Sequence, residues 1–161
     1  MNYQNGVMPT NEWFEKIKAH VDFKDKSVVD YGCAEGIMSI LAKDSGAFKV
    51  IGIDNKTYPY YEGVDFRQEV IGKQYKADIK IFSMIIHWIG KEETQKQADS
   101  KTVIYIFREA NSGYNYPTNG CWFPIREELD KFMKGFSNRH TEVLMEQDNH
   151  KKIILAIYEK N

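Results

Sequence analysis

One segment near the start of the chain, residues 28–36 (VVDYGCAEG), limits the fold more than any other. Its apolar beginning predicts a short buried strand, and its glycines at 32 and 36 predict a tight turn into a helix. Glycine at such a turn permits backbone angles closed to other residues and lets a ligand approach the main chain. The free N–H groups of the following helix point into the same space. A strand, a glycine turn and a helix in this order are typical of nucleotide-binding α/β folds.

Apolar strands alternate with amphipathic segments along the rest of the chain, which indicates a parallel sheet covered on both faces. Strands are expected at residues 27–30, 48–53, 64–68, 79–84 and 102–107. Helices are expected at residues 10–20, 37–46, 91–98 and 125–136. In the second helix, Ile37, Ile40 and Leu41 share one face. The final strands, 142–146 and 152–158, flank a polar turn and predict an antiparallel hairpin. The expected fold class is therefore α/β, a doubly wound and mostly parallel sheet that ends in a hairpin.

Length and composition limit the architecture and the class of partner. The 161 residues are 42% hydrophobic and contain no repeat or linker, so residues 1–161 are expected to form one domain. The 22 basic and 23 acidic side chains nearly cancel, whereas proteins that neutralise many phosphates carry a basic excess. The two cysteines imply no disulfide framework, and the sequence shows neither a signal-peptide pattern nor an apolar run of about 18 residues. We expect a cytoplasmic protein without a membrane span.

Two acidic residues flank the predicted ligand space. Asp30 comes directly before the glycine turn, where its negative charge would repel a pyrophosphate and attract an ammonium group. Asp54 ends the second strand, and a carboxylate there suits the two hydroxyls of a ribose. The glycines also depart from the G-x-G-x-x-G pattern of dinucleotide sites, since Ala34 stands between Gly32 and Gly36. These residues favour a nucleoside joined to an amino acid over a dinucleotide.

On these residues the sequence resembles the class I S-adenosylmethionine-dependent methyltransferases, a Rossmann-like family. The D-x-G-C-A-E-G turn, the acid after the second strand and the closing hairpin match that family's pattern. The resemblance implies that Asp54 holds the ribose of S-adenosylmethionine and that the turn holds its methionine part, through Asp30, Gly32, Cys33, Ala34 and Gly36. Ala34 replaces a glycine that is commoner in the family, a departure that a single methyl group should tolerate. The family usually has an acid or amide near the adenine, and Glu69 is the residue expected there.

The acceptor is expected beside the fourth strand, which the family order places next to the first. Residues 82–89 (FSMIIHWI) would then border the reacting methyl, with the small polar Ser83 against the cofactor. Methyl transfer is an in-line displacement on an activated donor, and positioning alone can supply up to roughly 7–11 kcal/mol. His87 is the one side chain in this segment with a pKa suited to removing a proton near neutral pH. The alternative is a histidine that packs beside Trp88 and caps the strand.

Several acceptor classes lack their usual residues in this chain. There is no N-P-P-Y or D-P-P-Y sequence, the family's motif for planar amino groups, and Ser83 stands where ribose methyltransferases have an acid. Cys121 lies in the loop after the fifth strand and matches neither position of a pyrimidine-attacking cysteine. That loop also carries aromatic residues that are candidates for acceptor contacts or a lid, or alternatively form a plug over the sheet edge: Tyr114, Tyr116 and Trp122.

The functional hypothesis is an S-adenosylmethionine-dependent methyltransferase that acts on an unidentified acceptor, with a small molecule favoured slightly over nucleic acid or protein. The alternative is a catalytically inactive subunit that binds S-adenosylmethionine and regulates a partner. A dinucleotide-dependent oxidoreductase is disfavoured by the glycine spacing, and no metal is expected. Because the connections after the second and third strands are short, either the acceptor docks on an open surface or a second chain completes the site.

Overall fold

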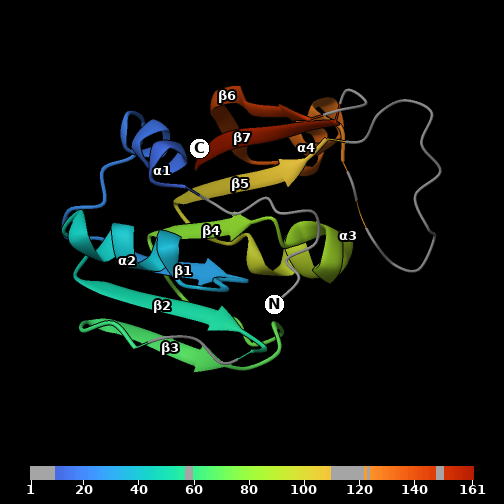
Figure 1. Ribbon diagram of the computed structural model, residues 1–161. Helices are drawn as coiled ribbons and strands as arrows, with labels where there is room; N and C mark the ends of the chain where they lie inside the picture. The colour runs from blue at the N-terminus through green and yellow to red at the C-terminus, as the bar shows by residue number, and fades with distance from the viewer. Residues whose placement is uncertain (1–9, 57–59, 110–121, 123, 148–150) are drawn as a thin grey trace.

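The computed structural model describes residues 10–56, 60–109, 122, 124–147 and 151–161. Seven strands form one sheet in the order β3-β2-β1-β4-β5-β7-β6 (Figure 1). The strands are β1 Ser27–Tyr31, β2 Lys49–Asp54, β3 Val64–Gln68, β4 Ile79–Ser83, β5 Thr102–Arg108, β6 Phe136–Gln147 and β7 Lys151–Lys160. The helices are α1 Asn11–Lys18, α2 Ile37–Asp44, α3 Ile86–Gln97 and α4 Arg126–Phe132. The first five strands run parallel, and β7 is antiparallel to both β5 and β6. The predicted Rossmann-like α/β fold with a closing hairpin is confirmed.

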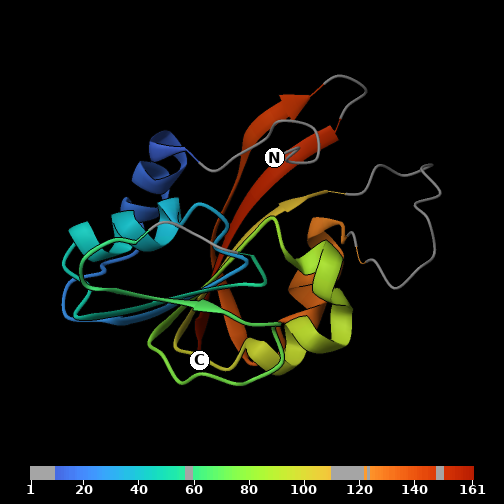
Figure 2. The same cartoon turned by 60° about the horizontal axis from the view of Figure 1, so that its bottom comes forward.

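Helices cover both faces of the sheet, as Figure 2 shows, with α1 and α2 on one side and α3 and α4 on the other. Successive side chains of a strand point to opposite faces, so each central strand contributes to both cores. In β4, Ile81 packs into the core under α1 and α2, and its neighbour Phe82 packs into the core with α3 and α4. Both side chains are completely buried. Burial on two faces explains why these strands are largely apolar in the sequence.

The structure differs from the sequence expectation at several element boundaries. Helix α3 begins at Ile86 rather than at residue 91, and it is bent at Gly90, whose φ of 76° and ψ of 175° are not helical. Helix α4 ends at Phe132 rather than at 136, because the chain turns at Gly135, where φ is 83°, and enters β6. Strand β6 starts earlier than expected because its outer edge tolerates polar residues.

Helix α2 buries Met38, Ser39 and Ala42 in the core, and Leu41 packs against the same core while partly exposed. Ile37 and Ile40, which share a face with Leu41 in the sequence pattern, are only partly buried. The hydroxyl of Ser39 donates a hydrogen bond to Asp30 of β1, 2.7 Å away, and this contact fixes which face meets the sheet. The cost of burying a carboxylate without a donor makes that orientation favourable.

The strand order reverses between β1 and β4, as expected from the sequence. In open α/β sheets the crevice at such a reversal, beside the carboxyl ends of the strands, is where ligands bind. A ligand site is therefore expected at the turns that follow β1, β2, β4 and β5. Within the described ranges, none of the helices has the length and apolar character needed to cross a membrane.

Candidate functional site

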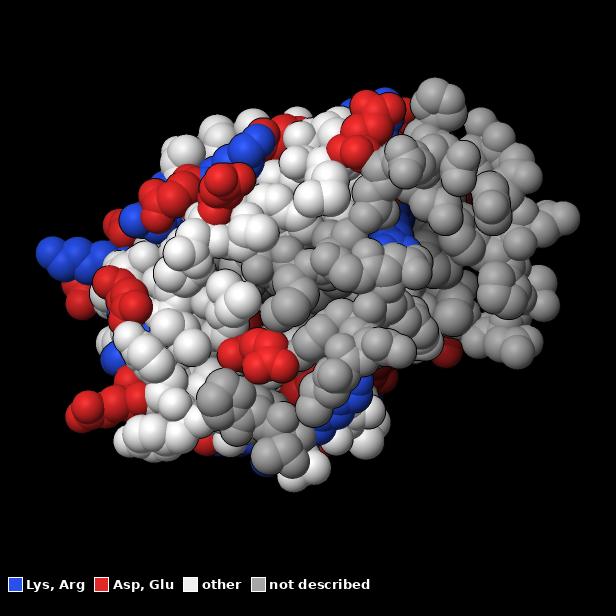
Figure 3. Space-filling model, viewed as in Figure 1, with Lys and Arg blue, Asp and Glu red and all other residues white. Residues whose placement is uncertain are grey.

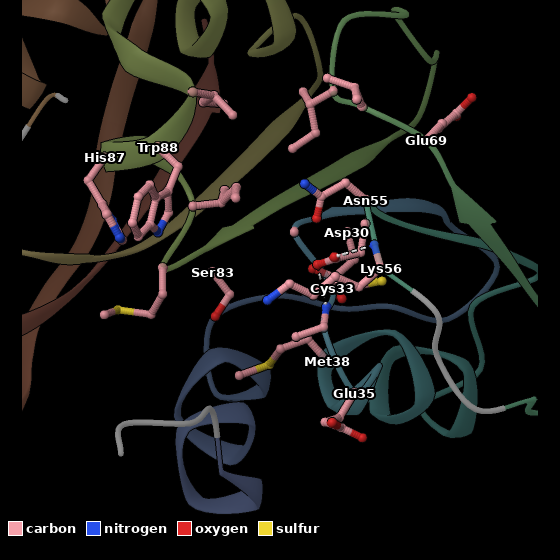
Figure 4. A pocket seen from close by; sticks show the side chains of 18 of the residues that line it. Asp30, Cys33, Glu35, Met38, Asn55, Lys56, Glu69, Ser83, His87 and Trp88 are labelled. Atoms are coloured by element: carbon pink, nitrogen blue, oxygen red, sulfur yellow. Dashed lines mark hydrogen bonds between the residues drawn. The ribbon is translucent and has the colours of Figure 1, made fainter. Parts of the chain in front are cut away.

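A cavity of about 770 Å³ lies at the carboxyl ends of the parallel strands. Its volume falls within the range of roughly 300–1,000 Å³ that small-molecule sites occupy. Described residues that line it come from the turn after β1, the ends of β2 and β3, and the segment from β4 into α3. In Figure 4, Asp30, Cys33 and Asn55 lie on one side of this space, and His87 and Trp88 lie across from them. The predicted donor and acceptor segments thus share one cavity.

The glycine turn after β1 is attached to β2 by backbone hydrogen bonds. The amides of Gly32 and Cys33 donate to the carbonyl oxygen of Ile53, at 2.8 and 3.0 Å. Gly32 has a φ of +71°, a conformation in which residues with a Cβ are strained. A Cβ added there would lie 2.7 Å from the side chain of Ile85. A side chain at position 32 would therefore meet Ile85 whether or not a ligand is bound.

Gly36 plays a different part from Gly32 in the described structure. It caps the start of α2 with a φ of +78°, and a Cβ there would lie 2.5 Å from the ring of Phe66. Gly36 is not among the described residues that line the cavity. Its lack of a side chain makes room for Phe66, and its conformation starts the helix whose Ser39 reaches Asp30.

The carboxylate of Asp54 connects the two halves of the donor side. One oxygen accepts a hydrogen bond from the amide of Ala34 at 3.0 Å, and the other accepts from the amide of Lys56 at 3.0 Å. Each carboxylate oxygen has a further lone pair, so Asp54 can still accept bonds from two hydroxyls. Ala34 has a φ of 46°, the left-handed region that favours glycine, which accounts for glycine being the commoner residue there.

Asp30 is completely buried and lines the cavity. One carboxylate oxygen accepts the Ser39 hydroxyl, and the other, Oδ1, has no hydrogen-bond partner among the described residues. Burial raises the pKa of Asp30 to about 7, and the nearby charge of Asp54 contributes to the rise. A cation beside Oδ1 would supply the charge and the hydrogen bond that this carboxylate lacks. The residue therefore fits the ammonium group expected from the sequence.

The segment that leaves β4 forms the other wall of the cavity. Ser83 is 7% exposed, and its hydroxyl oxygen has no hydrogen-bond partner within the described chain. Met84, the next residue, has a φ of 56°, which is unusual for a side-chain-bearing residue and costs of order 1–3 kcal/mol. Strained backbone of this kind often occurs at ligand sites. This left-handed conformation at Met84 sets the direction in which the chain passes from Ser83 into the first turn of α3.

His87 lies in that first turn and lines the cavity. Burial lowers the pKa of His87 to about 4, and the positive charge of Arg108 lowers it further. The imidazole is therefore neutral at pH 7 and is a weak base in this state. Its ring also packs against Trp88, with centroids 5.2 Å apart. The contact expected of a purely structural histidine is therefore present as well.

The remaining predicted residues are placed as follows. Glu69 lines the cavity, but its carboxylate accepts a hydrogen bond from the Tyr75 hydroxyl, and Figure 4 shows its side chain directed away from Asp30 and Asn55. Cys33 is a buried free thiol on the cavity wall, and burial raises its pKa. Trp122 packs against Phe132, with ring centroids 4.8 Å apart, and is not among the lining residues. Tyr114, Tyr116 and Cys121 lie outside the described residues.

The lining residues that the sequence did not predict include Asn55 and Arg108. Arg108 ends β5, and its Nε is buried without a hydrogen-bond partner among the described residues. A signal was present, because a single cation closes an otherwise apolar strand, TVIYIFR, on the ligand side of the sheet. No group of three or more His, Cys, Asp or Glu side chains that could hold a metal ion occurs in the described ranges.

Curated proteins match this chain over part of its length. No protein-family model matches the sequence. The ribosomal protein L11 methyltransferase of Shewanella sediminis is 41% identical over 56 residues, and that of Paraburkholderia phymatum is 54% identical over 56 residues. Each match covers 32% of this chain, and only 18% and 17% of the respective relative. The chain therefore spans less than a fifth of the length of these curated relatives.

Solved structures match over most of the chain. An S-adenosylmethionine-dependent methyltransferase from Mesorhizobium loti has a TM-score of 0.69 and 15% identity, over 94% of this chain and 99% of that one. The magnesium protoporphyrin IX methyltransferase of Synechocystis, with bound S-adenosylhomocysteine, has a TM-score of 0.66 and 18% identity, over 91% and 80%. TehB from Haemophilus influenzae has a TM-score of 0.67 and 12% identity, over 98% and 64%. The chain therefore has the Rossmann-like fold of these S-adenosylmethionine-dependent methyltransferase structures.

Proposed function

We propose that this chain binds S-adenosylmethionine in the cavity and transfers its methyl group to a small-molecule acceptor. The observation that carries this proposal is the buried carboxylate of Asp30, a residue that lines the cavity and whose Oδ1 has no hydrogen-bond partner among the described residues. A ligand with an ammonium group would satisfy it, and the amino-acid end of S-adenosylmethionine carries one. Asp54, at the end of β2, stands where a ribose diol would follow.

The proposal assigns each end of the cofactor to residues of the chain. Asp30 would hold the ammonium group, and the turn of Gly32, Cys33 and Ala34 would face the methionine part. Asp54 would accept the ribose hydroxyls, and Ser83 would donate to or accept from the cofactor across the cavity. Glu69 remains the proposed residue near the adenine, reached through its backbone or after its hydrogen bond with Tyr75 changes. Gly36 contributes by holding α2 and Phe66 in place.

The bound cofactor supplies a methyl group that is already activated by a positively charged sulfur. The chain has to hold the acceptor in line with that methyl and keep water away. Met84 and Ile85 give the acceptor side an apolar wall, and His87 is the proposed group that takes a proton when the acceptor must lose one. Because the pKa of His87 is lowered to about 4, it is neutral and able to accept a hydrogen bond at pH 7.

A small acceptor is supported by the surface as well as by the cavity. On the face shown in Figure 3, Lys and Arg side chains are interspersed with Asp and Glu on the described part of the surface. The chain carries a formal net charge of −1, which gives little electrostatic attraction for a polynucleotide. The curated relatives are named for ribosomal protein L11, but the match covers under a fifth of their length. A match of that extent does not assign the acceptor.

Two experiments test the proposal, donor binding first and turnover second. S-adenosylhomocysteine is expected to raise the melting temperature, because a ligand that binds only the native state stabilises it, and NAD is expected to have no effect. Incubation with methyl-labelled S-adenosylmethionine and a cell extract should then label the small-molecule fraction. Failure of S-adenosylhomocysteine to stabilise the protein would reject the donor site. Tight binding without any labelled product would support the inactive regulatory subunit instead.

Replacement of Asp54 by alanine is expected to weaken binding of S-adenosylhomocysteine by about 1.5–3 kcal/mol, since hydrogen bonds to a charged group contribute about that much. The variant also removes the acceptor for the amide of Ala34, so the turn should loosen. Calorimetric titration measures the affinity, and Asp54→Asn is the matched control that keeps one acceptor oxygen. Equal affinity in Asp54→Ala and the unchanged protein would contradict the ribose assignment.

We also propose a domain organisation and a cellular location for the protein. We take residues 1–161 to act as one domain in the cytoplasm, with a second copy or partner chain able to cover the acceptor side. Light scattering with and without S-adenosylhomocysteine, together with cell fractionation, addresses both statements. A monomer that turns over a free small molecule would remove the need for a covering chain.

A further inference from the structure

Charged side chains of both signs line the cavity. Three carboxylates, those of Asp30, Asp54 and Glu69, come from the ends of β1, β2 and β3, and the charged lining residues besides these and Arg108 are Glu35, Lys56 and Glu93. Arg108 comes from β5, which is separated from β1 by β4. Neighbouring strands are about 4.8 Å apart, so the end of β5 lies roughly 10 Å across the sheet from the turn after β1. The three strand-end carboxylates suit the positively charged donor, and Arg108 lies on the acceptor side.

Arg108 differs from the other arginines of this chain. The sequence contains four, and three of them form ion pairs: Arg67 with Asp65, Arg126 with Glu109, and Arg139 with Glu159. Arg108 has no carboxylate partner among the described residues, and its buried Nε has no hydrogen-bond acceptor there. Leaving a buried donor of a charged group unpaired costs free energy, which a bound anion would recover.

We propose that Arg108 binds an oxyanion of the methyl acceptor, a carboxylate or a phosphate group, and so makes the acceptor an acidic small molecule. This inference rests on the proposed function, because it names the acceptor of the same cavity. The guanidinium group pairs with both oxyanions through parallel N–H donors. Ser83, on the neighbouring strand, offers a buried hydroxyl without a partner among the described residues. Trp88 is half exposed and, with Met84 and Ile85, provides an apolar wall for the rest of such a molecule.

An anion on Arg108 would also act on His87. The positive charge of Arg108 is one of the two causes that lower the pKa of His87, and burial is the larger one. A bound oxyanion would offset that charge and raise the pKa of His87 toward its ordinary value. The histidine would then be a better base when the acceptor is present than when it is absent. The titration of His87 therefore reports directly on anion binding at Arg108.

Matched acid and amide probes test the inference. With the protein saturated with S-adenosylhomocysteine, we expect phenylacetate or phenyl phosphate to bind at least tenfold more tightly than phenylacetamide, measured by calorimetry. The preferred acid should also raise the pKa of His87, followed by NMR of the ring. Arg108→Gln should remove the acid preference and the His87 shift while its affinity for S-adenosylhomocysteine stays unchanged. Arg126→Gln, which removes an exposed arginine outside the cavity, should retain both effects.

The outcomes distinguish a carboxylate acceptor from a phosphate acceptor. They also distinguish failure of this inference from failure of the proposed function. Preference for phenylacetate alone identifies a carboxylate acceptor, and preference for phenyl phosphate alone identifies a phosphate. Equal binding of acids and amide, or an unchanged preference in Arg108→Gln, overturns the inference. A tenfold loss of S-adenosylhomocysteine affinity in Arg108→Gln also overturns it, because the arginine would then serve the donor. If Arg108→Gln does not fold, Arg108→Lys, which keeps the charge without the planar fork, should weaken the acid preference severalfold. Failure of S-adenosylhomocysteine to bind rejects the proposed function, and the acid and amide comparison can still be made on the ligand-free protein.

Discussion

Replacing Asp30 with asparagine is expected to stabilise the ligand-free protein at pH 8 and to lower its affinity for S-adenosylhomocysteine at least tenfold. In the folded protein, burial raises the pKa of Asp30 to about 7, above its value of 3.8 in an unfolded chain. The folded state therefore holds this proton more tightly, and its stability falls as the pH rises from about 4 to 7. Each pKa unit is worth about 1.4 kcal/mol, so the loss amounts to several kcal/mol. Asparagine is neutral at every pH and avoids that loss, but it cannot pair with an ammonium group.

The comparison is made by calorimetry at pH 5 and pH 8, followed by titration with S-adenosylhomocysteine. Asp78→Asn is the matched control, because the sign of its effect is opposite. The hydrogen bonds from the backbone and hydroxyl of Ser27 lower the pKa of Asp78 to about 2, so its ionised form contributes stability above pH 4 that is lost as the pH falls to about 2. Asp78→Asn should lower the melting temperature at pH 8 and leave the ligand affinity unchanged. A destabilised Asp30→Asn with normal affinity would refute the role given to this carboxylate.

Gly32→Ala is expected to destabilise the fold by several kcal/mol, before any effect on ligand binding. The left-handed conformation at this position costs a residue with a Cβ about 1–2 kcal/mol. The new Cβ would also lie 2.7 Å from Ile85, so one of the two must shift. Urea unfolding measures the free energy, and Gly72→Ala is the control, since a Cβ at Gly72 meets nothing within 4 Å.

A second substitution separates the clash from the backbone strain. In a background of Ile85→Ala the clash is relieved and the strain is not, so Gly32→Ala should cost less there. Residues in contact typically show interaction free energies of about 0.5–3 kcal/mol in such a cycle. Additive effects of the two substitutions would show that Ile85 is not the obstacle. The need for glycine at position 32 would then have to be explained by the backbone conformation and by the ligand.

Much of the fold could be predicted because its cause is local. Strands β1, β2, β4 and β5 were predicted within two residues, since strands buried on both faces are largely apolar. Strand β3 was predicted with the bounds it has, although it lies at the edge of the sheet and only Val64 in it is buried. The start of α3 was missed because residues 84–89 continue the apolar run of β4 and contain no N-capping side chain. The edge strand β6 was only partly predicted, because one of its sides meets solvent and its first residues are polar.

The site could be predicted only as far as its motif extends. Asp30, Gly32 and Asp54 follow from spacing along the chain, and all three line the cavity. The raised pKa of Asp30 could not be predicted, because it depends on how completely the fold removes water. Arg108 was missed for a similar reason, since the lack of a partner is a property of tertiary contacts. The reason for glycine at position 32 also lies in a distant residue, Ile85.

The hydrogen bonds of Asp54 set a constraint on redesign of the cofactor preference. One carboxylate fastens the turn after β1 and the chain after β2 at the same time, through the amides of Ala34 and Lys56. A variant made to accept a synthetic methyl donor with an altered sugar must therefore retain two acceptor sites at this position or replace them elsewhere. Enlarging the space by truncating the side chain would remove the brace that keeps the donor pocket in shape. Room for a bulkier sugar should be sought at other residues of the wall.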